Sequence, residues 1–128
     1  MTPAEEEVLQ LTRRLLISIL EADWETYAAL SDPALTAFEP ESLGHLVQGL
    51  DFHRFYFDRG GLPGPHNVTL ASPHVRLFGD VAVVCYVRLI QRLDGSGAPV
   101  TEPSMETRVW HRQEGGWKHV HFHRSRVA

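Results

Sequence analysis

Apolar positions repeat with two different periods along the chain, which divides it into a helical first half and a strand-rich second half. Val8, Leu11, Leu15 and Ile19 recur every three or four positions, as in an amphipathic helix. From His66 onward the period is two, which is typical of half-buried β-strands. This order predicts an α+β domain in which helices precede the sheet.

Capping residues set the expected limits of the first two helices. Thr2, Pro3 and Glu5 form a helix start with a capping box, and about five helical turns are expected to follow. Asp23 is the expected cap of a second helix over residues 24–30, because the Ser-Asp-Pro that comes next disfavours helical geometry. The first helix is long enough to cover a sheet with its apolar side.

A short strand, a third helix and a glycine-rich loop are expected between the two halves. Residues 35–38 are predicted as an edge strand, which an acidic segment containing proline brings to an end. The third helix is expected from about Leu50 and carries His53. Residues 59–65, which are rich in glycine and proline, form the expected hinge or lid.

Strands joined by turns at glycines are predicted for the second half. Residues 67–78 form a strand that is bent or bulged at Pro73, and residues 81–93 form its partner. Residues 106–124 form a last hairpin, whose two strands are joined across Gln-Glu-Gly-Gly. This hairpin completes a domain with its helices first and its sheet last.

Alternation of side chains along these strands places arginines on faces that are otherwise apolar. Arg88 shares a face with Tyr86, and Arg124 shares a face with Phe122. The residues expected on the opposite face of the last strand are Trp117, His119, His121 and His123. A buried guanidinium is costly unless it is paired. Either glutamates such as Glu106 form internal ion pairs with the arginines, or the arginines line a cavity that binds an anion.

Composition places the chain among globular domains with a core of their own. Its 128 residues are 43% hydrophobic, and we expect a single domain over residues 1–128. No apolar run approaches a membrane span, and the acidic start lacks the features of a secretory signal, so we expect a cytoplasmic protein without a membrane partner. The single cysteine, Cys85, fits a reducing compartment. The net charge of -4 argues against nucleic acid as a partner.

Several long segments of the chain form a recognisable set of motifs. Among them are Leu-Thr-Ala-Phe-Glu-Pro-Glu, Glu-Thr-Arg-Val-Trp-His-Arg and Val-His-Phe-His-Arg-Ser. These segments resemble the association (hub) domain of calcium/calmodulin-dependent protein kinase II. The matching segments span residues 35–41, 49–57, 73–75, 86–89, 106–112 and 120–125. They occur in the order of the family, and the resemblance runs from about Glu5 to Ser125.

The resemblance implies a nuclear transport factor 2-like cone. In this fold a long N-terminal helix and two shorter helices pack on a strongly curved, mostly antiparallel sheet that encloses a pocket. It also implies homodimers that stack as two rings of six or seven subunits, twelve or fourteen in all. The family's pocket arginines and pocket-edge histidine have counterparts in this chain. Tyr86 and Glu106 each stand two positions before one of these arginines. The expected ligand-binding residues are Arg88, Arg108, Arg124, His53, Tyr86 and Glu106.

These expectations favour a binding and assembly domain. The chain carries no kinase domain and no calmodulin-binding segment, so we expect a stand-alone oligomerisation domain, with any kinase partner encoded separately. Its pocket is expected to bind a small carboxylate or other anion through charge-assisted hydrogen bonds. The glycine-rich loop at residues 58–65 departs from the family, which has a longer polar or aromatic segment there.

The alternative is an enzyme of the ketosteroid isomerase or polyketide cyclase type in the same pocket. His53 would then imitate a base and Tyr86 a hydrogen-bond donor. Arginine stays protonated and makes a poor general base, so the arginine-lined pocket favours binding. No cofactor is expected.

The alternating histidines His119, His121 and His123 have a spacing that can chelate a transition metal. No carboxylate or cysteine stands nearby in the sequence to complete such a site, so no metal is expected. The histidine face could equally pack against a neighbouring subunit.

Overall fold

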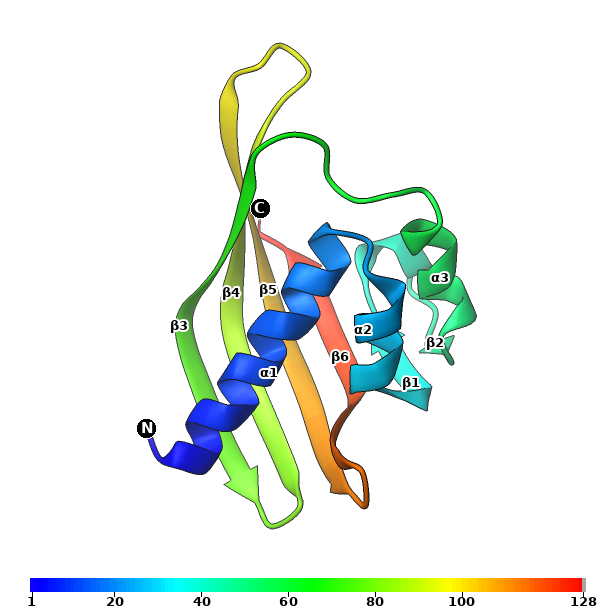
Figure 1. Cartoon of the computed structure of the whole chain (residues 1–128), viewed down its shortest axis with the longest axis vertical. Coiled ribbons are helices and arrows are strands. Elements are labelled where there is room, and N and C mark those ends of the chain that lie inside the picture. The colour runs from blue at the N-terminus through cyan, green and yellow to red at the C-terminus, as the bar shows by residue number, and fades with distance from the viewer. Residues whose placement is uncertain (128) are drawn as a thin grey trace.

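The computed structural model describes residues 1–127 and shows helices packed on a six-stranded sheet (Figure 1). The elements in chain order are α1 (Pro3–Leu20), α2 (Trp24–Leu30), β1 (Ser31–Phe38), the 3-10 helix η1 (Pro40–Ser42), β2 (Val47–Gln48), α3 (Asp51–Phe57), β3 (His66–Phe78), β4 (Val81–Leu93), β5 (Pro99–Gln113) and β6 (Gly116–Arg126). The helix-first, sheet-last order predicted from the periodicity is confirmed. None of the helices within residues 1–127 is both long enough and apolar enough to cross a membrane.

The strands follow the order β2-β1-β6-β5-β4-β3 across one open sheet. All neighbours are antiparallel except β1 and β6, which run parallel. The prediction that residues 35–38 form an edge strand is wrong, because β1 lies between β6 and the two-residue strand β2. Strands β1 and β6 are far apart in the chain, and local periodicity does not show which distant strands pair. The strong curvature expected of the sheet stays a prediction.

Local capping explains where α1 begins. The Thr2 hydroxyl accepts a hydrogen bond from the Glu5 amide, and the Glu5 carboxylate accepts one from the Thr2 amide, as the predicted capping box requires. The apolar side of α1 then crosses the sheet diagonally (Figure 1). Thr12 lies fully buried on this side, and its hydroxyl accepts a hydrogen bond from Trp110 Nε1 on β5 at 3.1 Å. This bond ties the middle of the helix to the middle of the sheet.

Two bulges change which side chains face the core. The first, predicted at Pro73, is confirmed: the register of β3 shifts between Ala71 and His74, and Ser72 has a positive φ of 49°. The second lies between β5 and β6. There Val109 pairs with His121 while Trp110 pairs with His119, so Val120 has no partner of its own.

The second bulge overturns one prediction about faces. Strict alternation places Trp117 and His119 with His121 and His123, opposite Phe122. The structure instead places Trp117 on the inner side, where its Nε1 donates to Glu7 on α1. In the structure His119 is fully buried and its ring stacks on Phe122, with 5.6 Å between the ring centroids. His121 and His123 remain on the other face of the sheet. The extra residue, Val120, shifts the alternation by one position, and no glycine or proline signals this in the sequence.

The glycine-rich loop after α3 is attached to the end of α1. The Leu62 amide donates a hydrogen bond to the Leu20 carbonyl at 2.8 Å. A Cβ atom on Gly61 would stand only 2.5 Å from the same carbonyl oxygen, so this close approach requires glycine. The loop expected as a hinge or lid is therefore anchored at one point, and its mobility stays a prediction.

Candidate functional site

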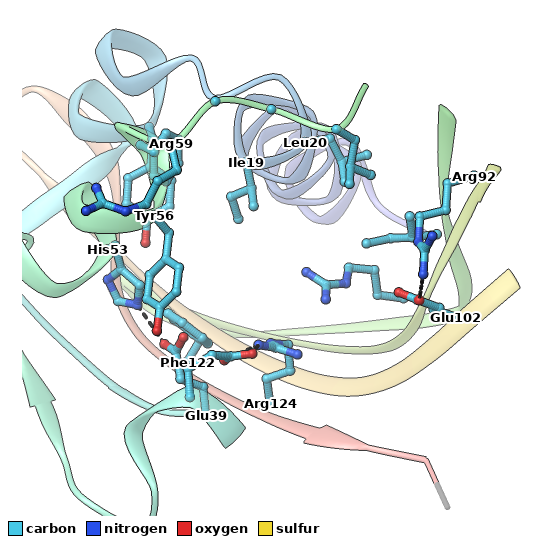
Figure 2. A pocket seen from close by; sticks show the side chains of 18 of the residues that line it. Ile19, Leu20, Glu39, His53, Tyr56, Arg59, Arg92, Glu102, Phe122 and Arg124 are labelled. Carbon is cyan, nitrogen blue, oxygen red and sulfur yellow. Dashed lines mark hydrogen bonds and ion pairs between the residues drawn. The ribbon is translucent and has the colours of Figure 1, made fainter. Parts of the chain in front are cut away.

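A pocket of about 460 Å³ opens between the C-terminal end of α1, helix α3 with its following loop, and the inner face of β4, β5 and β6 (Figure 2). This volume lies within the usual range of small-molecule sites, about 300–1,000 Å³. Its apolar lining consists of Ile19, Leu20, Tyr27, Phe57, Leu62, Ile90 and Phe122. Its ionisable lining consists of Glu39, Glu41, His53, Arg59, Arg88, Arg92, Glu102, Arg108 and Arg124. The pocket therefore offers both an apolar wall and a set of charges.

Glu106 lies beneath the pocket wall and is shared by two guanidinium groups. Its Oε1 accepts a hydrogen bond from Arg108 Nη2 at 3.0 Å, and its Oε2 lies 3.1 Å from Arg88 Nε. Burial alone would raise the pKa of this carboxyl group, but Arg108, Arg88 and the Tyr86 hydroxyl hold the pKa below its ordinary value. Two positive charges thus share one negative charge.

Arg108 is saturated with partners. Its Nε donates to the Tyr86 hydroxyl at 2.8 Å, its Nη1 lies 3.3 Å from His119 Nε2, and its guanidinium lies over the ring of Phe122. The residue is only 1% exposed. Burial works to lower the pKa of Arg108, yet Tyr86 and Glu106 raise it above its ordinary value. We conclude that Arg108 mainly organises the wall of the pocket.

Arg88 is less completely paired. Its contact with Glu106 lacks the alignment of a hydrogen bond, and no other residue in 1–127 accepts an aligned hydrogen bond from it. Burial lowers the pKa of Arg88 from its ordinary value, and the neighbouring Arg124 and Arg108 act in the same direction against Glu106. This guanidinium faces the pocket with donors to spare.

An ion pair and a carboxylate–imidazole contact lie on the side of the pocket toward η1 and α3. Arg124 Nη2 donates to the Glu41 carboxylate, at 2.6 Å from Oε1. The buried Glu39 carboxylate lies 2.6 Å from His53 Nε2 on α3. Figure 2 shows Glu39 and His53 toward one end of the pocket, Arg92 and Glu102 at the other, and Arg124 between them. Both alternatives from the sequence are thus present in part, because glutamates pair with the arginines that line a cavity.

The lining carries a small excess of positive charge. Five arginines contact the pocket, while three glutamates line it and Glu106 lies just behind the wall. The guanidinium groups exceed the carboxylates by one, at five against four. Among residues 1–127, Arg59 forms no ion pair and Glu39 contacts His53, while Arg88 and Arg108 share the single carboxylate of Glu106. The buried part of the excess therefore lies with Arg88 and Arg108.

The structure brings all six predicted site residues together. Arg88, Arg108, Arg124 and His53 line the pocket, and Tyr86 and Glu106 lie behind its wall, where they hold Arg108. Their contact with a ligand stays a prediction. Residues that sequence reasoning missed are Arg59, Arg92, Glu102 and Leu62 at the mouth of the pocket. Alternation along β4 continues from Arg88 through Ile90 to Arg92, so it could have indicated Arg92 as a further residue of the pocket.

The three alternating histidines do not form one cluster. His119 is buried beside Arg108, whereas His121 and His123 lie on the outer face of the sheet. Among residues 1–127, no group of three or more histidine, cysteine or acidic side chains is arranged to hold a metal ion. The bulge at Val120 separates the array that the sequence pattern places on one face.

The arrangement of helices, sheet and pocket defines a nuclear transport factor 2-like α+β protein. A nuclear transport factor 2-like superfamily protein from Salmonella enterica superposes with a TM-score of 0.78, at 23% sequence identity over 97% of this chain and 91% of that one. Residues 4–128 match the family model of the calcium/calmodulin dependent protein kinase II association domain. The chain therefore belongs to this association-domain family.

Solved hub domains resemble the chain more closely. The calcium/calmodulin-dependent protein kinase II hub homology domain of Chlamydomonas reinhardtii has a TM-score of 0.90 and 51% identity, over 98% of this chain and 99% of that one. The association domain of the C. elegans kinase has a TM-score of 0.90 and 44% identity, over 95% of each chain. The delta subunit of the kinase from Oryctolagus cuniculus is 50% identical over 124 residues, which cover 94% of this chain but 23% of that protein. The chain thus spans about a quarter of the length of this relative.

Proposed function

We propose that this domain assembles into a homo-oligomer through the outer face of its sheet and binds a small carboxylate in its pocket. The dimer is the basic unit of the proposed assembly, and rings of twelve or fourteen copies are its larger form. Membership of the association-domain family supports self-association. The shared carboxylate of Glu106, which leaves one guanidinium equivalent without a counterion, supports anion binding.

The outer face of the sheet is the surface that suits self-association. We define it by the outward side chains of β1, β4, β5 and β6, which are Thr36, Phe38, Val83, Cys85, Val87, Leu89, Met105, Thr107, Val109, His121 and His123. Helix α1 covers the opposite side of the sheet (Figure 1). The listed residues include no carboxylate, and Met105 is 51% exposed near their centre. A second copy of the same uncharged face buries apolar area without leaving an unpaired charge.

A mass measurement tests self-association. Light scattering on a sizing column is expected to give a multiple of the chain mass for the wild type. The Met105→Glu substitution places a charge on the outer face and is expected to reduce the mass toward that of one chain, with unchanged circular dichroism. Leu43→Glu is the matched control, because Leu43 is an 84% exposed leucine outside this face. A wild-type monomer, or a Met105→Glu oligomer of unchanged mass, would count against the proposal.

Thermal melting with matched ligands tests the pocket. Butyrate and benzoate are expected to raise the melting temperature, whereas butyramide and benzamide, which lack the charge, are not. Arg88→Gln removes the least paired guanidinium and leaves the Glu106–Arg108 ion pair in place, so it is expected to abolish the stabilisation in a folded protein. Arg14→Gln, on an exposed position of α1, is the control. Equal stabilisation by the amides would refute a charge-based site.

A proton-transfer enzyme is the second candidate, because of one observation. The buried Glu39–His53 pair lines the pocket, and a carboxylate next to an imidazole in an apolar wall is suited to general base chemistry. Exchange of the α-protons of cyclopentanone in heavy water tests it. Catalysed exchange that Glu39→Gln abolishes would support an enzyme, and a rate equal to that of buffer would remove this candidate.

A further inference from the structure

Two histidines stand next to each other on the outer face of the sheet. His121 and His123 are two residues apart on β6, beyond the bulge at Val120, so both point away from the core. The ring of Phe38 from the neighbouring β1 packs against both, with centroid distances of 6.4 Å to His121 and 5.7 Å to His123. His121 Nδ1 also shares a hydrogen bond of 2.8 Å with Thr36 Oγ1. The two imidazoles are therefore fixed parts of this face.

The histidine pair extends into a row across the sheet. His123 pairs with Thr107 on β5, Thr107 pairs with Cys85 on β4, and Cys85 pairs with His74 on β3. These residues line one shallow depression on the outer face together with His121. The row carries imidazoles at both of its ends and no carboxylate between them.

The surroundings supply no counterion for a protonated imidazole. The neighbours facing the two histidines are Thr36 and Phe38 from β1, Thr107 and Val109 from β5, Cys85 from β4 and His74 from β3. The charged groups that follow on the same strand are Arg124 and Arg126, which have the same sign. The Glu39 carboxylate at the end of β1 is held by His53 on the inner side. A proton added here therefore adds an uncompensated charge.

We infer that mild acid dissociates the homo-oligomer by protonating His121 and His123, an inference that rests on the proposed self-association through the outer face. In a contact between two copies of the same face, the imidazoles of both copies enter one interface. Neutral imidazoles allow the faces to pack. Once protonated, they place like charges opposite one another in a contact that holds no carboxylate, and such juxtaposition strongly disfavours binding.

The pKa of His121 is consistent with a neutral imidazole near neutral pH. Burial, followed by the neighbouring His123, lowers the pKa of His121 from its ordinary value, while its contact with Thr36 opposes this change. His121 is therefore neutral near neutral pH and takes up a proton only in mild acid. Packing of a second copy over the face would disfavour the charged form further, because it removes water.

The oligomeric mass at two pH values tests the inference. At about pH 7.5 the wild type is expected to run as an oligomer, and at about pH 5.5 its association constant is expected to fall about tenfold or more. The double variant His121→Gln and His123→Gln keeps polar side chains that do not titrate, so it is expected to hold its mass at both values. The control double variant His45→Gln and His66→Gln, at positions outside this face, is expected to dissociate like the wild type.

Each outcome has a distinct meaning. An oligomer whose mass is the same at both pH values, or a glutamine double variant that dissociates like the wild type, overturns the inference. So does dissociation that coincides with loss of the circular dichroism signal, since the acid would then unfold the chain rather than separate folded copies. A wild-type monomer already at about pH 7.5 overturns the proposed self-association itself. The mass at about pH 7.5 therefore distinguishes a failure of the proposed self-association from a failure of the acid-dependent step.

Discussion

Glu106 and Arg108 stand two residues apart on β5 and form an ion pair withdrawn from solvent, with Arg108 Nη2 3.0 Å from Glu106 Oε1. The same carboxylate accepts a hydrogen bond of 2.5 Å from the Tyr86 hydroxyl and balances Arg88. One acidic side chain thus holds together three neighbours on two strands. The stability of the pocket wall and its charge both depend on this residue.

Loss of the Glu106 charge is expected to destabilise the fold. Glu106→Gln leaves Arg88 and Arg108 buried without a carboxylate, and breaking a buried ion pair from one side typically costs about 3–5 kcal/mol. Urea denaturation measures the free energy of unfolding. Glu102→Gln serves as the comparison, because Glu102 pairs with Arg92 at the surface with its side chain 55% exposed, and its loss is expected to cost less than about 1 kcal/mol. Equal effects of the two substitutions would contradict the structural role of Glu106.

Stability is expected to fall in mild acid because of His119. Burial, followed by the charge of Arg108, lowers the pKa of His119 well below its ordinary value in the folded protein. Below about pH 6.5 the unfolded chain binds a proton at His119 and the folded chain does not. The free energy of unfolding is therefore unaffected by this residue above that pH, and falls by about 1.4 kcal/mol for each pH unit below it.

Urea titrations across this pH range measure the effect, with His119→Gln as the comparison. Glutamine can still accept a hydrogen bond from Arg108 but does not titrate, so the acid-dependent loss is expected to shrink in this variant. A loss of the same size in both proteins would assign the effect to other residues.

The close contact between the loop after α3 and the end of α1 supports a third prediction. Gly61→Ala places a Cβ atom 2.5 Å from the Leu20 carbonyl oxygen, so the loop has to move away from α1. Such overpacking typically costs about 1–3 kcal/mol. Hydrogen exchange at the Leu62 amide, which donates to Leu20, is expected to accelerate. Gly95→Ala, where no atom lies within 4 Å of the added Cβ, should leave both stability and exchange unchanged.

The bond between α1 and the sheet supports a fourth expectation. Thr12→Val keeps the shape of the side chain but leaves the buried indole N–H of Trp110 without an acceptor. An unsatisfied buried donor costs about 1–3 kcal/mol, which denaturation of the variant measures. Thr12→Ser retains the hydroxyl and is expected to lose less. If serine proved as destabilising as valine, the lost methyl contact rather than the hydrogen bond would explain the effect.

Much of the fold follows from local sequence signals. Thr2 and Asp23 cap α1 and α2 as predicted, and β4 spans the predicted residues 81–93, because caps, turns and alternation depend on neighbouring residues. The same alternation correctly places Arg88 and Arg124 on the inner face with their apolar neighbours. Family resemblance, rather than alternation, singled out Arg108 and His53.

The remaining features depend on contacts between distant segments. The sequence pattern left open whether glutamates such as Glu106 pair with the arginines. The structure uses Glu41 as well, and this choice depends on how η1 packs against β6. It also gave no sign of the extra residue Val120, which moves His119 to the inner face. A bulge without glycine or proline shows itself only in the register between strands.

The parallel pairing of β1 with β6 has a consequence for folding kinetics. Its first pair, Ser31 with His119, joins residues 88 positions apart, while β3 to β6 are joined by short local turns. Closing so long a loop is slow relative to local pairing, so the amides of β1 are expected to gain protection last in pulse-labelled hydrogen exchange. Until then β6 presents an unpaired edge, where a strand of another copy can add in place of β1. Refolding yield should therefore decrease as protein concentration rises.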